Sequence, residues 1–563
     1  MVEPDPSSAD LSSPVAPVTG PEGAAALGLA GRTVVVGGAG TAGMSATRYL
    51  VTLGVHVLLA DDRFATRAAD PDARRSAIDA VTGVAELTSQ GVEPVATADL
   101  LADPAWTAHT AVVVVSPGFA PTNALVTAAA DAGIPVWGEV ELAWRVDAAG
   151  LLGEPRTWLV VTGTNGKTTT TSMLAGIIDA SGRAGAACGN IGLPVLDAMR
   201  ATPRVDVLCA ELSSFQLHWA PSIRPDAGVV LNVADDHLDW HGTFEAYAAA
   251  KAGALRGAIS VVGLDDAVAS GLPASGRRVG FTLGPPGPGQ LGVVDGQLVD
   301  RAFGAGPLYA ADEVSPAGPS GVSDALAAAA LALAIGVDGN AVRAGLSAFR
   351  PARHRGEVVA TREGIAFVDD SKATNPHAAQ AAISAFGRVV LIAGGLLKGA
   401  SLDDMLVAVG DRLAGVVAIG RDRSLVVEAI ARHAPEVPTV TVFTGDDGTV
   451  NAHRPGLPAP DSPLASPDRL PDTYRTSDTS ESPTAVPDKQ AGVAETERAT
   501  AVAVMDRAVE EAWALATTSD PTPDAVLLAP AAASLDMFAG YGRRGDAFAD
   551  AAHRIAGSTT AGR

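Results

Sequence analysis

Short runs of β-branched and aliphatic residues alternate along the chain with longer stretches rich in alanine and leucine. A strand that is buried on both faces reads as a continuous apolar run, and helices are needed to cover such strands. The alternation therefore predicts an α/β fold built on parallel sheets. The runs lie at 33–38, 55–62, 111–118, 157–163, 205–212, 227–233, 366–371, 388–395, 415–420, 439–443 and 525–532.

Polar and turn-forming residues divide this pattern into larger blocks. Nearly every apolar run ends in Gly, Asp, Ser or Asn, and the carboxyl ends of strands are where open α/β sheets bind ligands. Turn-forming or charged residues near 153 and 350 mark two seams. We predict three nucleotide-fold-like domains in series, at 29–153, 154–350 and 351–563. The Pro- and Ser-rich segments 1–28 and 446–498 lack periodicity and are predicted to be a disordered tail and a disordered insertion.

Composition narrows the classes of function. The 563 residues are 47% hydrophobic, enough for several cores, and carry a net charge of −23. That charge argues against a nucleic-acid or anionic-membrane binder, because phosphate binding needs clustered cations. No apolar run approaches the roughly 20 residues that span a bilayer, and the acidic N-terminus is no secretory signal. The two cysteines, Cys188 and Cys209, show no pairing pattern and are predicted to be reduced packing residues of a cytosolic protein.

The first glycine-rich loop follows the first strand. Gly38, Gly40 and Gly43 have G-x-G-x-x-G spacing between a strand and a helix, and Asp61 closes the next strand. Taken alone, this pattern predicts an NAD-type cofactor on the helix N-terminus, or a tight turn with no ligand. A second and different phosphate loop farther along the chain argues against a dehydrogenase.

That second loop has the sequence GTNGKTT at 163–169. Its amides can surround phosphate oxygens, Lys167 can neutralise them, and the Thr168 hydroxyl can bind magnesium. Val161 stands where the general phosphate-loop pattern has its first glycine. Glu211 and His237 trail later strands and could reach the same metal, although either alone would more often be a surface or capping residue.

Several motifs occur in one order along the chain: GTNGKTT, CGNIGLP, ELSSFQL, NVADDHLD with HGTFEAYAAAK, DDSKATN and APAAASLDMF. In this order they resemble the Mur ligases, over about residues 32–555 apart from the Pro- and Ser-rich insertion. SPGF, ELSSFQL and DDSKATN resemble the D-glutamate-adding branch. The resemblance implies a Rossmann-like UDP-binding domain, a central P-loop ATPase-type domain and a C-terminal Rossmann-like domain that binds the amino acid.

The same resemblance implies an activity and its partners. The enzyme would join D-glutamate to UDP-N-acetylmuramoyl-L-alanine with ATP, through an acyl phosphate, as a step of peptidoglycan precursor synthesis. We expect a cytoplasmic monomer with two Mg²⁺ ions, without nucleic acid and without membrane insertion. Lys251 matches the family's carbamylated lysine, in which a cation becomes a carboxylate-like metal ligand.

The resemblance also implies residue roles. The catalytic residues would be Lys167, His237, Lys251 and His354. The ATP site would comprise Gly163, Thr164, Asn165, Gly166, Lys167, Thr168, Thr169, Asp324, Arg355 and Asp370. The UDP-substrate site would comprise Thr41, Ala42, Asp61, Arg63, Asn190 and Ser213. The D-glutamate site would comprise Lys372, Thr374, Lys398, Ser534, Leu535 and Tyr541. The metal ligands would be Thr168, Glu211, His237 and Lys251.

Three positions depart from the family pattern. Ala42 replaces a hydroxyl residue, Asp324 stands where an adenine-contacting Asn is expected, and Tyr541 replaces a common Phe. Three other functions remain open: a related ligase for another amino acid or for folate, an NAD-binding oxidoreductase fused to an NTPase, and a non-catalytic nucleotide-binding scaffold.

Overall fold

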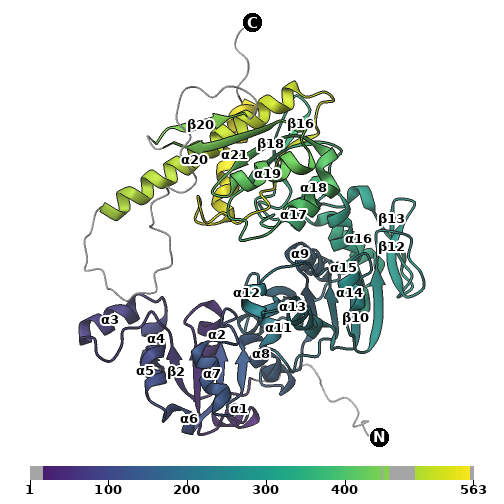
Figure 1. Ribbon diagram of the computed structural model, residues 1–563. Helices are drawn as coiled ribbons and strands as arrows, with labels where there is room; N and C mark the ends of the chain where they lie inside the picture. The colour runs from purple at the N-terminus through teal and green to yellow at the C-terminus, as the bar shows by residue number, and fades with distance from the viewer. Residues whose placement is uncertain (1–16, 446–447, 455–488, 558–563) are drawn as a thin grey trace, which may run out of the picture. The chain divides into compact units, whose positions relative to one another are not determined.

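The computed structural model describes residues 17–445, 448–454 and 489–557. Its strands form three sheets of five, nine and seven strands, each covered by helices (Figure 1). The chain divides into two compact units. Unit 1 comprises 1–315 and 321–349 and holds the first two sheets, whereas unit 2 comprises 316–320 and 350–563 and holds the third. The predicted α/β fold class is confirmed.

The first sheet has the strand order β3-β2-β1-β4-β5, and all its pairings are parallel. This is the order of a Rossmann half, in which the chain reverses direction between β1 and β4 and opens a crevice at their carboxyl ends. The strands are β1 (Thr33–Gly37), β2 (His56–Ala60), β3 (Glu93–Val95), β4 (Thr110–Val115) and β5 (Val136–Gly138). The helices are α1 (Gly20–Ala26), α2 (Thr41–Thr52), α3 (Pro71–Asp79), α4 (Val84–Ser89), α5 (Thr97–Ala102), α6 (Trp106–His109), α7 (Ala124–Asp131) and α8 (Glu139–Ala148).

The central sheet has the order β14-β13-β12-β11-β10-β9-β6-β8-β7 and is parallel from β12 to β7. Its strands are β6 (Thr157–Thr162), β7 (Gly185–Gly189), β8 (Val207–Glu211), β9 (Ala227–Val230), β10 (Ile259–Gly263), β11 (Arg277–Phe281), β12 (Gln290–Val294), β13 (Gln297–Asp300) and β14 (Gly306–Ala310). Its helices are α9 (Lys167–Ala180), α10 (Val195–Met199), α11 (Ser214–His218), α12 (Leu238–His241), α13 (Phe244–Lys251), η1 (Ala252–Leu255), α14 (Ala267–Gly271), η2 (Ala311–Glu313), α15 (Pro319–Ala334) and α16 (Gly339–Ala348). The phosphate loop follows β6, which lies inside the parallel part of the sheet.

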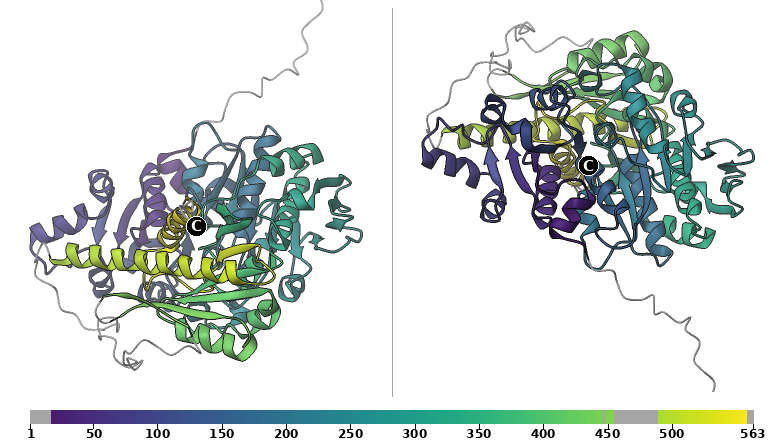
Figure 2. Two further views of the ribbon diagram at one scale, coloured as in Figure 1. Left: turned by 90° about the horizontal axis from the view of Figure 1, so that it is seen from above. Right: turned by 90° about the horizontal axis from the view of Figure 1, so that it is seen from below.

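The third sheet has the order β15-β16-β21-β17-β18-β19-β20, with antiparallel pairs at both edges. Its strands are β15 (Glu357–Arg362), β16 (Ile365–Asp369), β17 (Val389–Gly394), β18 (Leu413–Ile419), β19 (Thr439–Thr444), β20 (Val450–His453) and β21 (Ala525–Leu528). Its helices are α17 (Pro376–Ser384), α18 (Asp403–Val409), η3 (Gly410–Arg412), α19 (Arg423–His433), α20 (Lys489–Thr518) and α21 (Tyr541–Gly557). Figure 2 shows α20 lying along this sheet, where Met505 and Ala508 join the core with Val417.

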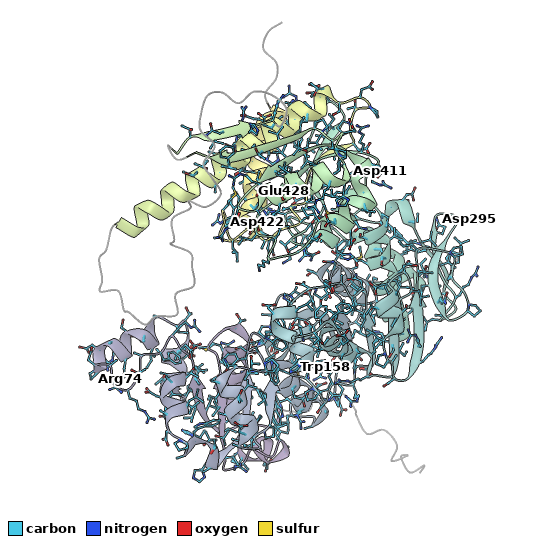
Figure 3. The ribbon with its side chains drawn as sticks, in the orientation of Figure 1. Arg74, Trp158, Asp295, Asp411, Asp422 and Glu428 are labelled. Carbon is cyan, nitrogen blue, oxygen red and sulfur yellow. The ribbon has the colours of Figure 1, made fainter. Side chains whose placement is uncertain are left out.

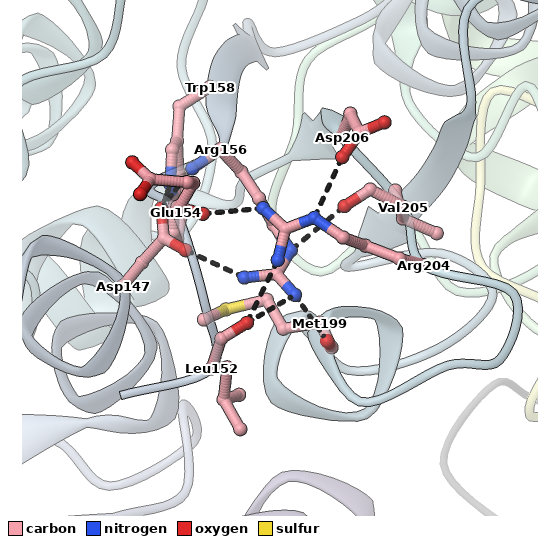
Figure 4. Close-up of polar contacts among 9 residues, drawn as sticks. All are labelled: Asp147, Leu152, Glu154, Arg156, Trp158, Met199, Arg204, Val205 and Asp206. Atoms are coloured by element: carbon pink, nitrogen blue, oxygen red, sulfur yellow. Dashed lines mark hydrogen bonds and ion pairs between the residues drawn. The ribbon is translucent and has the colours of Figure 1, made fainter. Parts of the chain in front are cut away.

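A buried ion pair joins the first domain to the central one. Arg156, which precedes β6, pairs with Asp147 of α8 at 2.8 Å, and both side chains are almost fully buried. The Arg156 guanidinium also donates to the carbonyls of Met199 and Val205, and the Trp158 indole donates to Asp147 (Figure 4). Because each charge is hydrogen-bonded, this network can remain buried and hold the end of α8 against the central sheet.

Two predicted boundaries are wrong in part. The tail was predicted to run to 28, but α1 occupies Gly20–Ala26, and the Val18 amide donates to the Leu151 carbonyl. The insertion was predicted over 446–498, but β20 forms at Val450–His453 and α20 begins at Lys489. Both segments gain structure by pairing or packing against distant residues, which local composition does not report. Residues 1–16, 446–447 and 455–488 of these segments lie outside the described residues.

Two other features bear on the sequence predictions. Cys188 and Cys209 are buried and unpaired, and they belong to the cores on opposite faces of the central sheet, as expected for packing residues. Within the described ranges, none of the helices combines the length and apolar character needed to cross a membrane.

Candidate functional site

The first glycine loop closes tightly on itself at the carboxyl end of β1. A Cβ at Gly43 would lie 1.9 Å from the Gly38 carbonyl oxygen, so only glycine allows this approach. The Asp61 carboxylate accepts the Ala39 amide at 2.6 Å and is gripped by the Arg63 guanidinium through two bonds of 2.8 Å. The structure therefore brings the predicted UDP residues Asp61 and Arg63 together beside the start of α2, where Thr41 and Ala42 lie.

These contacts stabilise the negatively charged form of Asp61. Burial alone would raise its pKa, but the hydrogen bonds from Arg63 and from the Ala39 and Arg63 amides outweigh burial and lower the pKa to about 2. Asp61 is thus a fixed anion that shapes the loop and orients Arg63. The Arg63 side chain remains 56% exposed and is available to an anionic ligand.

The second loop joins β6 to α9 and presents the N-terminus of a fourteen-residue helix. Gly166 has a φ of +85°, and a Cβ there would lie 2.3 Å from an Asp324 oxygen. The Lys167 ammonium folds back onto the carbonyls of Gly163 (2.9 Å) and Thr164 (2.8 Å). The electrostatic potential at this loop is therefore positive, because the helix dipole, the loop amides and the Lys167 ammonium all contribute to it. Such a site favours phosphate oxygens.

A second lysine reaches the same carbonyl from α13. Lys251 is only 2% exposed, and its ammonium donates to the Gly163 carbonyl at 2.8 Å. It also lies over the Tyr247 ring, 4.5 Å from the centroid. Burial, and then the neighbouring Lys167 cation, lower the pKa of Lys251 well below its ordinary value. This lysine is therefore far easier to deprotonate than an exposed one.

Glu211 ends β8 beside this loop and is 1% exposed. Its Oε1 accepts the Asn190 side-chain amide at 2.8 Å, so two residues predicted for different ligands are in contact. Its Oε2 is buried and meets no hydrogen-bond donor of the described residues. A buried carboxylate oxygen without a donor is costly unless a cation or an ordered water approaches it. Glu211 thus fits a metal ligand.

His237 is the N-cap of α12 and has the left-handed conformation, with a φ of +54°. Burial lowers its pKa against the opposing effect of the neighbouring Asp236 carboxylate, and the Lys251 and Lys167 cations lower it further. A neutral imidazole is the form that binds metals. The described residues hold no cluster of three or more His, Cys, Asp or Glu placed for a metal. The predicted set differs from such a cluster, since it combines one Glu and one His with Thr168 and Lys251.

The remaining predicted residues of unit 1 line the same region. Asp324 of α15 is 7% exposed and accepts the Thr170 hydroxyl at 2.9 Å, beneath Gly166. Thr168 and Thr169 lie half-buried in the first turn of α9. The Asn165 amide donates to Asn232 at 2.8 Å, and Ser213 caps α11 through a capping box with Gln216.

In unit 2 a histidine and a carboxylate form a buried pair. His354, at a φ of +66°, places Nδ1 2.7 Å from Asp369 Oδ2 at the end of β16. Its Nε2 faces Asp546 of α21 at 3.7 Å. Asp370 follows directly; burial first, and then the neighbouring Asp369 charge, raise its pKa to about 7, against the opposing effect of Arg355.

The predicted D-glutamate residues come from loops at the carboxyl ends of neighbouring strands in unit 2. Lys372 follows β16, and its ammonium lies 4.1 Å from the centroid of the Tyr541 ring. Ser534 is buried, whereas Leu535 is 66% exposed. Lys398 is exposed at a φ of +52° after β17, and Thr374 donates its amide to the Lys372 carbonyl. Asp422, labelled in Figure 3, accepts the Leu397 amide at 2.8 Å.

Sequence reasoning missed the residue that joins these loops. Arg544 of α21 is 1% exposed and donates to the carbonyls of Ser371, Ala532 and Gly394, which follow or end β16, β21 and β17. Burial lowers its pKa to about 10, so it remains a cation at neutral pH. Its only sequence signal is a charged residue in the apolar stripe of a terminal helix.

Comparison with known proteins gives a consistent family. The model of the Mur ligase middle domain matches residues 161–276, and that of the Mur ligase glutamate ligase domain matches 354–454. A UDP-N-acetylmuramoylalanine--D-glutamate ligase of Rhodococcus jostii is 51% identical over 538 residues, covering 94% of this chain and 96% of its own. The ligase of the same name from Mycolicibacterium smegmatis is 50% identical over 532 residues, covering 94% and 97%.

Among solved structures, a pseudomurein peptide ligase type C from Methanothermus fervidus is 15% identical with a TM-score of 0.48, covering 93% of this chain and 100% of that one. The UDP-N-acetylmuramate-alanine ligase of Thermotoga maritima is 17% identical with a TM-score of 0.43, covering 73% and 90%.

Proposed function

Because the chain belongs to the Mur ligase family, we propose that it joins D-glutamate to UDP-N-acetylmuramoyl-L-alanine at the expense of ATP, in peptidoglycan precursor synthesis. The observation that carries this proposal is the similarity, along nearly the whole chain, to ligases named for that reaction. The geometry supplies independent support, since two lysines, a helix N-terminus and a buried carboxylate meet at one loop of unit 1.

The ATP phosphates would lie on the loop at 163–169. Amides at the start of α9 would bind phosphate oxygens, and Lys167 would exchange its two carbonyl partners for them, because an ammonium bonds an anion more strongly than a neutral carbonyl. Asp324 would act on this site through the loop, since it packs beneath Gly166 and holds Thr170.

The residues present fit magnesium, which we propose is held by Thr168, Glu211, His237 and a carbamylated Lys251. When bound, the metal would neutralise charge on the phosphates. Lys251 is suited to carbamylation because its lowered pKa favours the neutral amine, which adds to carbon dioxide and releases a proton. The resulting carboxylate would replace a buried cation beside Lys167 by an anion, which removes a repulsion.

The chemistry requires two displacements. An oxygen of the substrate's alanyl carboxylate attacks the γ-phosphorus of ATP, the bond to the bridging oxygen breaks, and ADP leaves. The neutral amine of D-glutamate then attacks the acyl carbon. The bond from that carbon to the phosphate oxygen breaks, inorganic phosphate leaves, and the nitrogen loses a proton. The protein's part is to position the groups and to stabilise developing negative charge, chiefly with Lys167.

The two substrates would meet separate sets of residues. Arg63, oriented by Asp61, would bind the UDP portion together with Thr41 and Ala42, and Asn190 and Ser213 would contact the sugar side. In unit 2, Lys372, Lys398, Thr374, Ser534, Leu535 and Tyr541 would bind D-glutamate, with the two ammonium groups facing its two carboxylates.

Three residues of unit 2 would serve ATP. Arg355 and Asp370 would contact the nucleotide, and His354, held by Asp369, would lie beside them as a catalytic residue. We further propose that the enzyme acts as a cytoplasmic monomer.

Phosphate release from ATP tests this function. Release should require both UDP-N-acetylmuramoyl-L-alanine and D-glutamate, and L-glutamate, L-lysine or meso-diaminopimelate should not replace D-glutamate. Phosphate release with another amino acid would mean that the protein is a ligase with a different amino-acid specificity. If no amino acid supports phosphate release and the protein binds NADH, the result would favour the oxidoreductase alternative. If the protein binds the UDP-substrate and ATP without turnover, the result would favour the non-catalytic scaffold.

A further inference from the structure

Two tryptophans of the central domain donate hydrogen bonds to successive carbonyls of a first-domain loop. This loop, 116–119, follows β4. The Trp219 indole N–H donates to the Phe119 carbonyl at 3.0 Å, and the Trp240 indole N–H donates to the Gly118 carbonyl at 3.3 Å. Trp219 is 8% exposed, whereas Trp240 is only half-buried. Trp219 therefore belongs to the fixed junction, and Trp240 is the more adjustable of the two.

The same loop contacts the first glycine loop. The Ser116 hydroxyl donates to the Gly38 carbonyl at 3.2 Å. A Cβ at Gly38 would lie 3.0 Å from the Phe119 ring, so ring and loop are in contact. A ligand that binds at the carboxyl ends of β1 and β4 would therefore touch or displace loop 116–119.

Trp240 connects this loop to His237. It lies in α12, a four-residue helix whose N-cap is His237 and which is too short to be stable by itself. The Phe215 ring lies 4.6 Å from the Trp240 ring and 4.8 Å from the His237 ring, measured between centroids. The position of His237 is consequently set by what Trp240 and Phe215 contact.

The ring contacts continue to the phosphate loop. His241, at the end of α12, lies 5.3 Å from Tyr247, and the Tyr247 hydroxyl lies 2.9 Å from the Thr164 hydroxyl. Continuous contacts therefore run from Gly118 in the first domain to Thr164 in the phosphate loop, entirely within unit 1.

We propose that Trp240 is a positioning residue that couples binding of the UDP-linked substrate to the metal and nucleotide site. Substrate that orders loop 116–119 would fix the Gly118 carbonyl, and the Trp240 hydrogen bond would then hold α12 with His237 in its metal-binding position. The inference rests on the proposed function, because it takes the UDP-substrate and the metal to bind where that function places them.

Trp240→Phe tests the coupling, because it keeps the ring and deletes the N–H. The affinity for a non-hydrolysable Mg²⁺–ATP analogue is measured with and without saturating UDP-N-acetylmuramoyl-L-alanine, in the absence of D-glutamate. In the wild type the substrate should tighten nucleotide binding, and by linkage the nucleotide should tighten substrate binding equally. Loss of one hydrogen bond should reduce this coupling by about 2- to 10-fold.

Trp144→Phe is the matched control. Trp144 lies in α8 and meets Trp158 edge-on at 5.4 Å, so the substitution removes an indole of unit 1 away from loop 116–119. It should leave the coupling unchanged. Trp240→Tyr, which also lacks the indole N–H, serves as a second variant should Trp240→Phe fold poorly, and thermal unfolding checks both.

The outcomes separate the two proposals. Coupling that falls in the Trp240 variants, with each ligand's separate affinity changing less, supports the inference. Equal coupling in the wild type, Trp240→Phe and Trp144→Phe overturns it, as does a wild type without coupling that still releases phosphate with D-glutamate. A wild type that neither binds the UDP-substrate nor releases phosphate overturns the proposed function, and the inference with it.

Discussion

At the scale of single residues, Lys251 differs most from what its sequence context indicates. A lysine in the alanine-rich run of α13 would ordinarily be an exposed helical residue, yet this one is 2% exposed and shares a carbonyl with Lys167. Burial of a cation beside another cation is unfavourable, so the site favours a form of Lys251 without positive charge.

Lys251→Arg should therefore abolish ligation, because arginine keeps the cation and cannot form the carbamate under these conditions. For the wild type, removal of carbon dioxide should lower the rate, and bicarbonate should restore it. The fraction of carbamate should fall as the pH drops through the lowered pKa of Lys251, since protonation removes the reactive amine. The proposal that Lys251 is carbamylated would be contradicted if the wild-type ligation rate did not depend on carbon dioxide and the Lys251→Arg variant were active.

Asp61 provides a second prediction at this scale, on stability. Its pKa falls from 3.8 to about 2 on folding, so the folded state prefers the carboxylate. The resulting stability is present above pH ~4 and is lost as the pH falls from there toward 2. Because the Arg63 side chain is exposed, solvent screens the ion pair and reduces its contribution. Asp61→Asn should therefore lower the free energy of unfolding by about 1 kcal/mol at neutral pH.

Urea unfolding of wild type and Asp61→Asn at a series of pH values checks this. The difference between them should shrink with acidification below pH ~4. A constant difference down to pH ~2 would assign the effect to packing and not to charge.

At the scale of elements, the hydrophobic runs located the strands that carry the chemistry. All eleven predicted runs form strands, because buried parallel strands require continuous apolar sequence. Ten of the described strands were not predicted: the short strands β3, β5 and β7, the parallel strands β10 and β11, and the strands with an antiparallel neighbour, β12 to β15 and β20. Their apolar runs are short or interrupted by Gly, Ser or charged residues, so the pattern does not mark them. The glycine loops were found from spacing, because their conformations demand glycine.

Tertiary contacts account for what the sequence did not reveal. The Arg544 bonds to the Ser371 and Gly394 carbonyls join segments more than a hundred residues apart, so no local pattern reports them. The same holds for the indole bonds of Trp219 and Trp240 to loop 116–119, which span a hundred residues or more. The pairing of Glu211 with Asn190 likewise depends on the register of β7 beside β8.

The connection between α8 and β6 supplies a prediction at this scale. Asp147→Ala would leave Arg156 buried without its carboxylate and should lower the free energy of unfolding by about 3–5 kcal/mol. Asp206→Ala is the control, because it breaks an ion pair with Arg204 whose side chains are 34% and 61% exposed. That change should cost at most about 1 kcal/mol. Urea unfolding followed by tryptophan fluorescence compares them, and equal costs would refute the role of the buried pair.

At the scale of the whole molecule, the proposed function divides the substrates between the two units. Unit 1 holds the residues proposed for the UDP-substrate and the ATP phosphates, and unit 2 holds those proposed for D-glutamate. The net charge of −23 makes local positive sites such as Lys167 and Arg63 necessary, since both nucleotide substrates are anions.

The central claim is that an oxygen of the alanyl carboxylate passes into inorganic phosphate through an acyl phosphate. The direct measurement uses UDP-N-acetylmuramoyl-L-alanine whose terminal carboxylate carries a heavy oxygen isotope, with ATP and D-glutamate, and determines the mass of the phosphate released. The account predicts one heavy oxygen atom in each phosphate, formed in step with the amide product and only when D-glutamate is present. Phosphate without the heavy isotope, released at the same rate as the product, would contradict it.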